Sequence, residues 1–147
     1  MSREPAETRE AFGHFQEITT RWADNDVFAH VNNVIYYSYF DTAVTEFLIR
    51  NGVLDIEKSD VVGLVVNTQC NYFSSMAFPD RVHVGLRIAN QGTSSVRYDI
   101  AIFRNDEQTA YAQGHFVHVY VDRATNRPVP VPQNLVRALE KIKRPDV

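Results

Sequence analysis

The sequence is poor in several features that would narrow its function at once. Its only cysteine, Cys70, cannot form an internal disulfide, and a single thiol excludes a zinc site built from paired cysteines. Because Cys70 lies in an apolar run, we expect a reduced and packed thiol. No uninterrupted apolar stretch of roughly 18 residues is present, so we predict no membrane-spanning helix.

The N-terminus lacks the apolar segment of a secretory signal, since its first ten residues carry Arg and Glu with no apolar run behind them. We therefore expect a cytoplasmic protein. The chain also lacks an excess of positive charge, because its formal net charge is −3 and its pI is about 5.9. The electrostatic field of a chain with net negative charge attracts neither nucleic acid nor an anionic membrane, so we expect neither as a partner.

Internal repeats, low-complexity tracts and linkers are absent too, and 147 residues suit one domain with one core. Polar ends flank a patterned middle. We predict a flexible N-terminal segment over residues 1–11, a single domain over residues 12–143, and a tail over residues 144–147.

A long helix is predicted early in the chain. Asn32 and Asn33 are plausible N-cap residues, and Gly52 is a natural stop, so the helix is expected to run to about Asn51. Aromatic and aliphatic side chains recur at helical spacing along it, at Tyr36, Phe40, Ala43 and Phe47. This spacing predicts one apolar face directed at the core.

Strands account for most of the rest. One is permitted before the helix, over residues 12–22, and the alternation of apolar and polar side chains predicts others over residues 62–72, 82–88, 96–102 and 110–121. Short turn-forming segments separate the last four, which favours an antiparallel meander. Three prolines between residues 128 and 132 indicate a surface segment before a short helix over residues 133–143.

This layout is an α+β fold, a hotdog in which a curled antiparallel sheet of about five strands surrounds one long central helix. A sheet packed on a single helix leaves its opposite face and its edges uncovered. We therefore expect self-association, to a homodimer at least.

Polar residues gather where the first strand meets the helix. The stretch from Arg21 to Tyr36 reads RWADNDVFAHVNNVIY, and it resembles the signature of the 4-hydroxybenzoyl-CoA thioesterase-like family. The helix, the Phe78-Pro-Asp80 turn, the Gly114-His-Phe116 strand and the proline-bearing exit follow in the family's order. The resemblance covers roughly Phe15 to Leu139.

The resemblance implies an acyl-CoA thioesterase, active as a homodimer or homotetramer and needing no cofactor beyond water. The second aspartate of the family's D-x-D pair is catalytic, which corresponds to Asp26, and Asp24 is then a supporting residue. The family polarises the thioester carbonyl with a backbone N–H at the helix start, which corresponds to Asn33. Elementary physics agrees, because the first turn of a helix has unpaired N–H groups and the positive end of the helix dipole.

Several roles stay open at this level. Asp26 could attack the carbonyl as a nucleophile or activate water as a general base. We regard His30, Asn32, Tyr36 and Asp41 as candidate substrate-binding residues. Each also has a purely structural interpretation: a hydrogen-bonded loop histidine, a helix cap, a core aromatic residue and a solvent-facing acid.

Two other functional classes compete with hydrolysis. A hotdog hydratase or dehydratase would need a histidine and aspartate facing the substrate, and His30 is the histidine nearest Asp26 in the sequence. A non-catalytic module that only binds acyl thioesters would most readily lack Asp26, which is present. A metal site at His115 and His118 is not expected, because an odd offset in a strand places the two rings on opposite faces.

Overall fold

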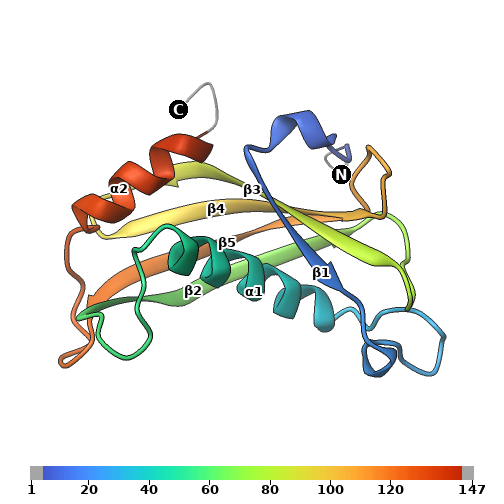
Figure 1. Cartoon of the computed structure of the whole chain (residues 1–147), viewed down its shortest axis with the longest axis horizontal. Helices are drawn as coiled ribbons and strands as arrows, with labels where there is room; N and C mark the ends of the chain where they lie inside the picture. The colour runs from blue at the N-terminus through green and yellow to red at the C-terminus, as the bar shows by residue number, and fades with distance from the viewer. Residues whose placement is uncertain (1–4, 144–147) are drawn as a thin grey trace.

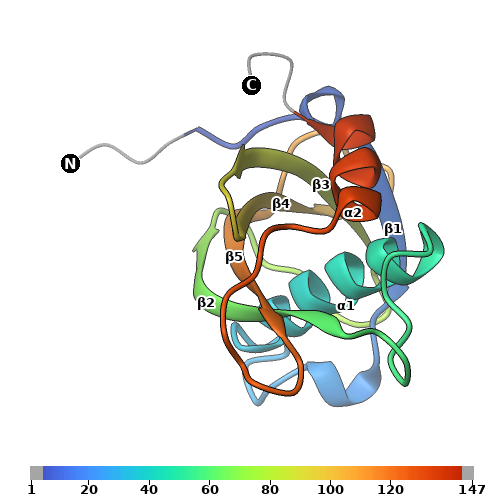
Figure 2. The same ribbon diagram turned by 90° about the vertical axis from the view of Figure 1, so that its left-hand side faces the viewer.

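The computed structural model describes residues 5–143, and within them five strands form one antiparallel sheet. The strands are β1 (His14–Thr19), β2 (Val61–Tyr72), β3 (Arg81–Gln91), β4 (Ser95–Arg104) and β5 (Ala112–Asp122). Two α-helices accompany them, α1 (Ile35–Arg50) and α2 (Gln133–Leu139), together with the 3-10 turns η1 (Arg9–Ala11), η2 (Trp22–Asp24) and η3 (Glu140–Ile142). The sheet curls around α1, so the predicted α+β hotdog architecture is confirmed (Figures 1 and 2).

The helix α1 packs its apolar side against the concave face of the sheet. All four side chains of the predicted stripe, Tyr36, Phe40, Ala43 and Phe47, are buried. Burial of a large apolar side chain contributes about 1.5–3 kcal/mol to folding, so this face anchors the helix in the core. The helix begins at Ile35 with Val34 as its N-cap residue, rather than with the predicted caps Asn32 or Asn33, which belong to the turn that leads into it.

The order of the strands differs from the predicted meander. The sheet runs β1-β3-β4-β5-β2, so β3, β4 and β5 form a meander while β2 pairs with β5 instead of β3. The Phe78–Asp80 segment is not a hairpin turn. Residues 73–80 form a longer connection that carries the chain across the sheet to begin β3 beside β1.

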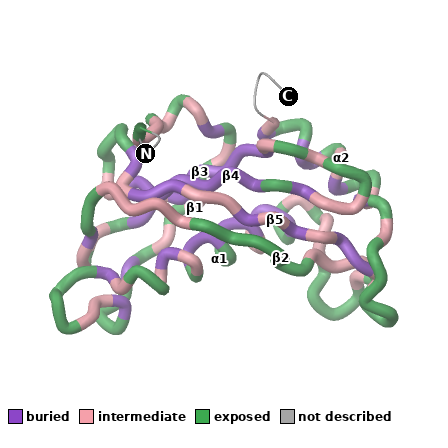
Figure 3. The backbone as a smooth tube through the Cα atoms, turned by 180° about the vertical axis from the view of Figure 1, so that it is seen from behind, coloured by how far each residue is buried: buried purple, intermediate pink, exposed green. Residues whose placement is uncertain are grey.

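One edge of the sheet is exposed. β2 is hydrogen-bonded to β5 on one side, and Leu64, Val65 and Val66 in its middle are 44%, 44% and 59% exposed. In Figure 3 the middle of β2 is the exposed part of a sheet whose neighbouring strands are largely buried. The uncovered sheet edge that the sequence led us to expect is therefore present in the single chain.

The two ends of the chain meet this framework differently. Residues 5–11 of the predicted N-terminal segment lie against the outer face of the sheet, where Glu7 pairs with the buried Arg87 at 2.7 Å. Residues 1–4 and the predicted tail, 144–147, lie outside the described residues. The predicted C-terminal helix is observed as α2 followed by the 3-10 turn η3.

Candidate active site

The residues between η2 and α1 form a tight loop that presents Asp26. The Asp26 N–H donates to the His30 carbonyl at 2.9 Å, and the Ala29 N–H donates to the Asp26 carbonyl at 3.0 Å. Ala29 adopts a positive φ of 63°, a conformation seldom taken by residues other than glycine. The loop is thus closed on itself by backbone bonds, and the position of Asp26 follows from its backbone geometry.

The Asp26 carboxylate is half-buried and only partly engaged. Its Oδ1 accepts a hydrogen bond from the Phe28 N–H at 2.9 Å, and its Oδ2 accepts one from Asn32 Nδ2 at 3.3 Å. Asn32 Oδ1 in turn accepts from the Val34 N–H at 2.9 Å, which ties the carboxylate to the start of α1. A carboxylate has about four lone-pair directions, so Asp26 keeps capacity for a water molecule or a substrate.

A pocket of about 350 Å³ opens beside this loop. It is built from three parts of the chain: the loop itself, the first turn of α1, and the end of β2 with the residues that follow it. Its lining residues are Asp26, Phe28, His30, Val31, Asn33, Tyr36, Tyr72, Phe73, Ser74 and Ser75. We refer to it as the Asp26 pocket.

Asn33 and Tyr36 line the pocket from the helix start. The Asn33 carbonyl accepts a hydrogen bond from the Tyr72 hydroxyl at 2.7 Å, whereas within residues 5–143 its N–H has no protein acceptor. Tyr36 packs edge-to-face on Tyr72 with ring centroids 5.0 Å apart, and burial raises the pKa of its hydroxyl to about 12. Tyr36 is therefore a neutral wall of the pocket, and the Asn33 N–H is available to a ligand.

Asp24 has a different environment. It is 1% exposed, and its carboxylate accepts from the Tyr39 hydroxyl at 2.8 Å, from the Arg21 N–H at 2.9 Å and from the Arg21 guanidinium at 2.8 Å. Burial acts to raise the pKa of Asp24, but these hydrogen bonds outweigh it and leave the pKa below its usual value. Asp24 therefore joins η2 to α1 as an ionised structural residue.

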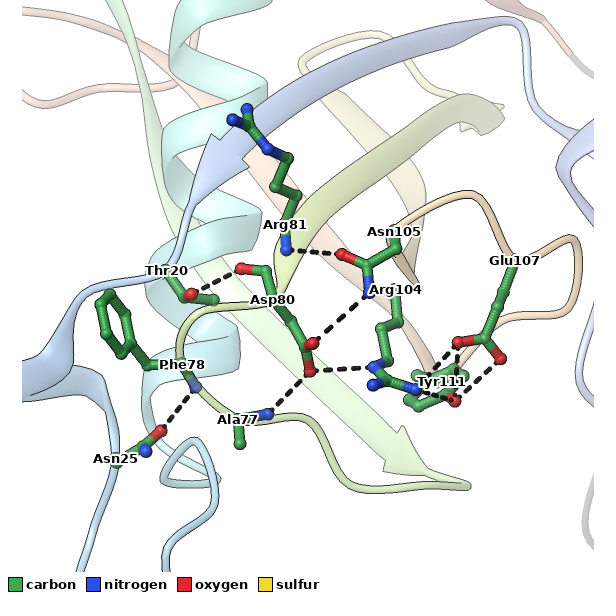
Figure 4. A network of polar contacts seen from close by, with 10 residues as sticks. All are labelled: Thr20, Asn25, Ala77, Phe78, Asp80, Arg81, Arg104, Asn105, Glu107 and Tyr111. Carbon is green, nitrogen blue, oxygen red and sulfur yellow. Dashed lines mark hydrogen bonds and ion pairs between the residues drawn. The ribbon is translucent and has the colours of Figure 1, made fainter.

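A second polar network holds the other side of the loop (Figure 4). Asn25 Oδ1 accepts from the Phe78 N–H at 3.0 Å, while the Asp80 carboxylate accepts from the Ala77 N–H at 3.1 Å and from Arg104 Nε at 2.9 Å. Burial acts to raise the pKa of Asp80, and these donors lower it overall. The Asp26 loop is thereby attached to the 73–80 connection, which Asp80 and Arg104 join to β4.

The structure brings most of the predicted site residues together. Asp26, His30, Asn33 and Tyr36 line one pocket, and Asn32 bonds to Asp26 from behind it. Asp41 does not join them, because it lies further along α1 on a different cavity of the same chain. Sequence reasoning missed the contribution of Tyr72, Phe73, Ser74 and Ser75, for which the chain has no local signal.

In the described part of the chain, no group of three or more His, Cys, Asp or Glu side chains could hold a metal ion. Among residues 5–143, no helix is both long and apolar enough to cross a membrane.

Known proteins resemble this chain in both sequence and structure. The solved structure of PA5185 from Pseudomonas aeruginosa PAO1 is 50% identical, with a TM-score of 0.93 over 96% of this chain and 99% of that one. A DHNA-CoA thioesterase from Staphylococcus aureus is 21% identical, with a TM-score of 0.76 over 86% and 88%, which shows a shared fold. The curated relative YsmA of Bacillus subtilis is 22% identical over 90 residues, and the match spans 61% of this chain and 60% of that protein.

The family model described as the thioesterase-like superfamily matches residues 20–139. This range contains the Asp26 loop, α1 and all strands but β1. The predicted resemblance is confirmed, and so, at the level of the family, is the predicted enzyme class, a thioester hydrolase. The chain belongs to the thioesterase-like superfamily.

Proposed function

We propose that this protein hydrolyses an acyl-CoA thioester to a free acid and coenzyme A in the Asp26 pocket. One observation carries the proposal: the partly engaged Asp26 carboxylate lines the same pocket as Asn33, whose N–H has no acceptor within residues 5–143. The family membership supports thioester chemistry, and the DHNA-CoA thioesterase of the same fold acts on a CoA ester by its name.

The chemistry divides between these two groups. As the tetrahedral intermediate forms, the thioester oxygen gains negative charge, and the Asn33 N–H at the helix start stabilises it. Asp26 either takes a proton from the water that attacks the carbonyl, or attacks the carbonyl itself to form a mixed anhydride that water then hydrolyses. In both routes the C–S bond breaks as the tetrahedral intermediate collapses, and the CoA thiolate that leaves takes up a proton. A single turnover in ¹⁸O-labelled water distinguishes the routes, because only the anhydride route can place the label in the Asp26 side chain.

The remaining candidate residues have distinct proposed roles. His30 and Tyr36 line the pocket and would contact the substrate. Asn32 orients Asp26 through its side-chain amide. Asp41 could act on a substrate at this pocket only if a second copy of the chain brought it there, since it lies elsewhere in the single chain.

Self-association through β2 would supply that second copy. The exposed residues Leu64, Val65 and Val66 lie on an edge strand, and apolar side chains at an unpaired edge favour pairing with another strand. We propose a homodimer joined at this edge, with a tetramer as a further step. Light scattering after gel filtration tests it: the mass should be at least twice 16.8 kDa, and Val66→Lys should reduce it to that of one chain.

The deciding experiment is a thiol-release assay across short, medium, long and aromatic CoA esters. We expect turnover of at least one class by the wild-type protein and near-complete loss with Asp26→Asn, which changes charge and little volume. Binding of all esters without thiol release would instead indicate a binding module, and release that persists in Asp26→Asn would disprove the catalytic role.

A further inference from the structure

The residues that lead into α1 receive a hydrogen bond from the sheet. Tyr72, the last residue of β2, donates from its hydroxyl to the Asn33 carbonyl at 2.7 Å. This carbonyl lies outside the helical ladder, because the Tyr37 N–H, four residues further on, donates to the Val34 carbonyl at 3.2 Å. The Tyr72 hydroxyl therefore takes the place of a helical donor.

Tyr72 is a well-fixed donor. Its backbone pairs with Ala112 of β5 in the antiparallel ladder, and its ring packs edge-to-face on Tyr36. Burial raises the pKa of the Tyr72 hydroxyl above its ordinary value, so the group keeps its proton at neutral pH. The sheet thus holds a neutral O–H against the residues that begin the helix.

This hydrogen bond is the first of three that lead to the Asp26 carboxylate. The Asn33 carbonyl shares a peptide group with the Val34 N–H, which donates to Asn32 Oδ1 at 2.9 Å. The Asn32 amide then donates from Nδ2 to Asp26 Oδ2 at 3.3 Å. Because a backbone N–H donates and a carboxylate oxygen accepts, the two ends of the Asn32 amide are assigned by their partners.

Every donor in this series points the same way, from Tyr72 toward Asp26. Hydrogen bonds arranged head to tail polarise one another, so a donor at the first position strengthens the bonds that follow. The bond from Asn32 to Asp26 is the longest of the three, which makes it the one most in need of this support.

We propose that Tyr72 is a positioning residue for the hydrolysis proposed above. Its hydroxyl orders the Asn33–Val34 peptide, and this peptide orders the Asp26 carboxylate through Asn32. The inference rests on the proposed function, because it assigns Tyr72 a part in the same reaction. A small misplacement of the reacting carboxylate slows the chemical step more than it weakens binding, so kcat rather than KM should depend on this hydroxyl.

The kinetic test measures thiol release from acetyl-, octanoyl-, palmitoyl- and benzoyl-CoA, and compares variants on the ester that the wild type hydrolyses fastest. Tyr72→Phe keeps the ring on Tyr36 and removes the hydroxyl, so kcat should fall about tenfold while KM stays within about twofold. Tyr111→Phe is the matched control, since it removes a hydroxyl that donates to Glu107 instead of Asn33. It should leave kcat and KM unchanged.

A double-mutant cycle tests the route through Asn32. Asn32→Ala removes the amide that joins Val34 to Asp26. Adding Tyr72→Phe to Asn32→Ala should therefore lower kcat by less than about threefold further. If Tyr72→Phe lowers kcat by the same factor in both backgrounds, the hydroxyl does not act through Asn32.

An NMR readout tests the series without turnover. In ¹H–¹⁵N spectra, Tyr72→Phe should move the proton signals of the Val34 N–H and the Asn32 side-chain amide upfield, because their hydrogen bonds weaken. Replacing Tyr72 by 3-fluorotyrosine keeps the ring and gives a stronger donor, so it should move both signals downfield, and it serves if Tyr72→Phe does not fold. Tyr111→Phe should leave both signals in place.

Three outcomes would overturn the role of Tyr72 while wild-type thiol release persists: unchanged Val34 and Asn32 signals in Tyr72→Phe, a rise in KM without a fall in kcat, or an equal loss of kcat in Tyr111→Phe. Absence of thiol release from every ester with the wild-type protein would instead overturn the hydrolysis itself, and the role of Tyr72 with it.

Discussion

Asp24 and Asp26 are the same residue type two positions apart, and they occupy opposite environments. Asp24 is 1% exposed, and its carboxylate is held by Tyr39 and Arg21. Asp26 is half-buried, accepts two hydrogen bonds and lines a pocket. The comparison shows that burial and full pairing make Asp24 a structural carboxylate of the loop, whereas the Asp26 carboxylate keeps capacity for a ligand.

The largest expected effect comes from removing the charge of Asp26, the less buried member of the pair. Asp26→Asn should lower kcat/KM for thioester hydrolysis by about 10³-fold, within the usual range for a lost general base. Its Tm should stay within roughly 2 °C of the wild type, since a half-exposed side chain away from the core is replaced by an isostere. Thiol release measures kcat/KM, and thermal unfolding measures the Tm. If Asp26→Asn lost as much stability as Asp24→Asn, the two aspartates would not differ in structural role.

The next effect concerns the N–H that faces the same pocket. Asn33→Pro should reduce kcat by about 10²-fold, because it removes one donor to the developing oxyanion. Asn33→Ala keeps the N–H and should stay within about threefold of the wild type. Steady-state kinetics measure kcat for both variants, and circular dichroism verifies that α1 remains folded. Equal losses in the two variants would place the oxyanion donor elsewhere.

Asp24→Asn should act on stability instead. The buried carboxylate accepts charge-assisted hydrogen bonds on both oxygens, and an amide can accept only part of them. The free energy of unfolding should therefore fall by about 2 kcal/mol. Urea denaturation measures this, and the hydrolysis rate of the remaining folded protein should change less than in Asp26→Asn. If kcat instead falls by 10³-fold with unchanged stability, the roles of the two aspartates are reversed.

Tyr39→Phe tests the structural role of Asp24 by removing one of its hydrogen-bond donors. It removes one donor to Asp24 while the Arg21 N–H and guanidinium remain, so the loss should be about 1 kcal/mol in urea denaturation. Tyr37→Phe is the matched control, because Tyr37 lies two residues earlier on α1 and has no hydrogen bond to Asp24 within residues 5–143. It should lose less. A larger loss in Tyr37→Phe would show that the Tyr39–Asp24 bond contributes little.

The smallest effect is a dependence on pH. The pKa of Asp24 in the folded protein lies below its unfolded value of about 3.9. The ionised carboxylate therefore contributes its full stabilisation of the folded state at pH values above about 3.9, and this stabilisation is lost as the pH falls through the folded pKa. The stability difference between wild type and Asp24→Asn should therefore be constant from pH 5 to 7 and shrink below about pH 4. A difference that grows on acidification would contradict the lowered pKa.

Local patterns predicted the elements well. The stripe of Tyr36, Phe40, Ala43 and Phe47 predicted α1 because helical spacing places such residues on one face, and all four are buried. Alternation predicted β2, β3 and β4 to within a few residues. The Arg21–Tyr36 motif indicated Asp26 and Asn33 as partners, and both line one pocket.

Long-range pairing was not predictable in the same way. The turn residues near Phe78 and Pro79 favoured a β2–β3 hairpin, but they carry no information about which strand lies next to β3. Tyr72, Ser74 and Ser75 reach the Asp26 pocket because the 73–80 connection crosses to the start of α1, where the Val31 N–H bonds to the Met76 carbonyl. Nothing adjacent to these residues in the sequence signals that contact.

The sequence by itself determined the helix, the strands, the Asp26 loop and the family, because periodicity and a contiguous motif are local properties of the chain. Only the tertiary structure decided that β2 is an exposed edge, that Asp24 is paired with Tyr39 fifteen residues away, and that His118 shares a cavity with α1. These features depend on which distant segments pack together. Packing is set by the free energy of the whole core, and no short stretch of sequence contains it.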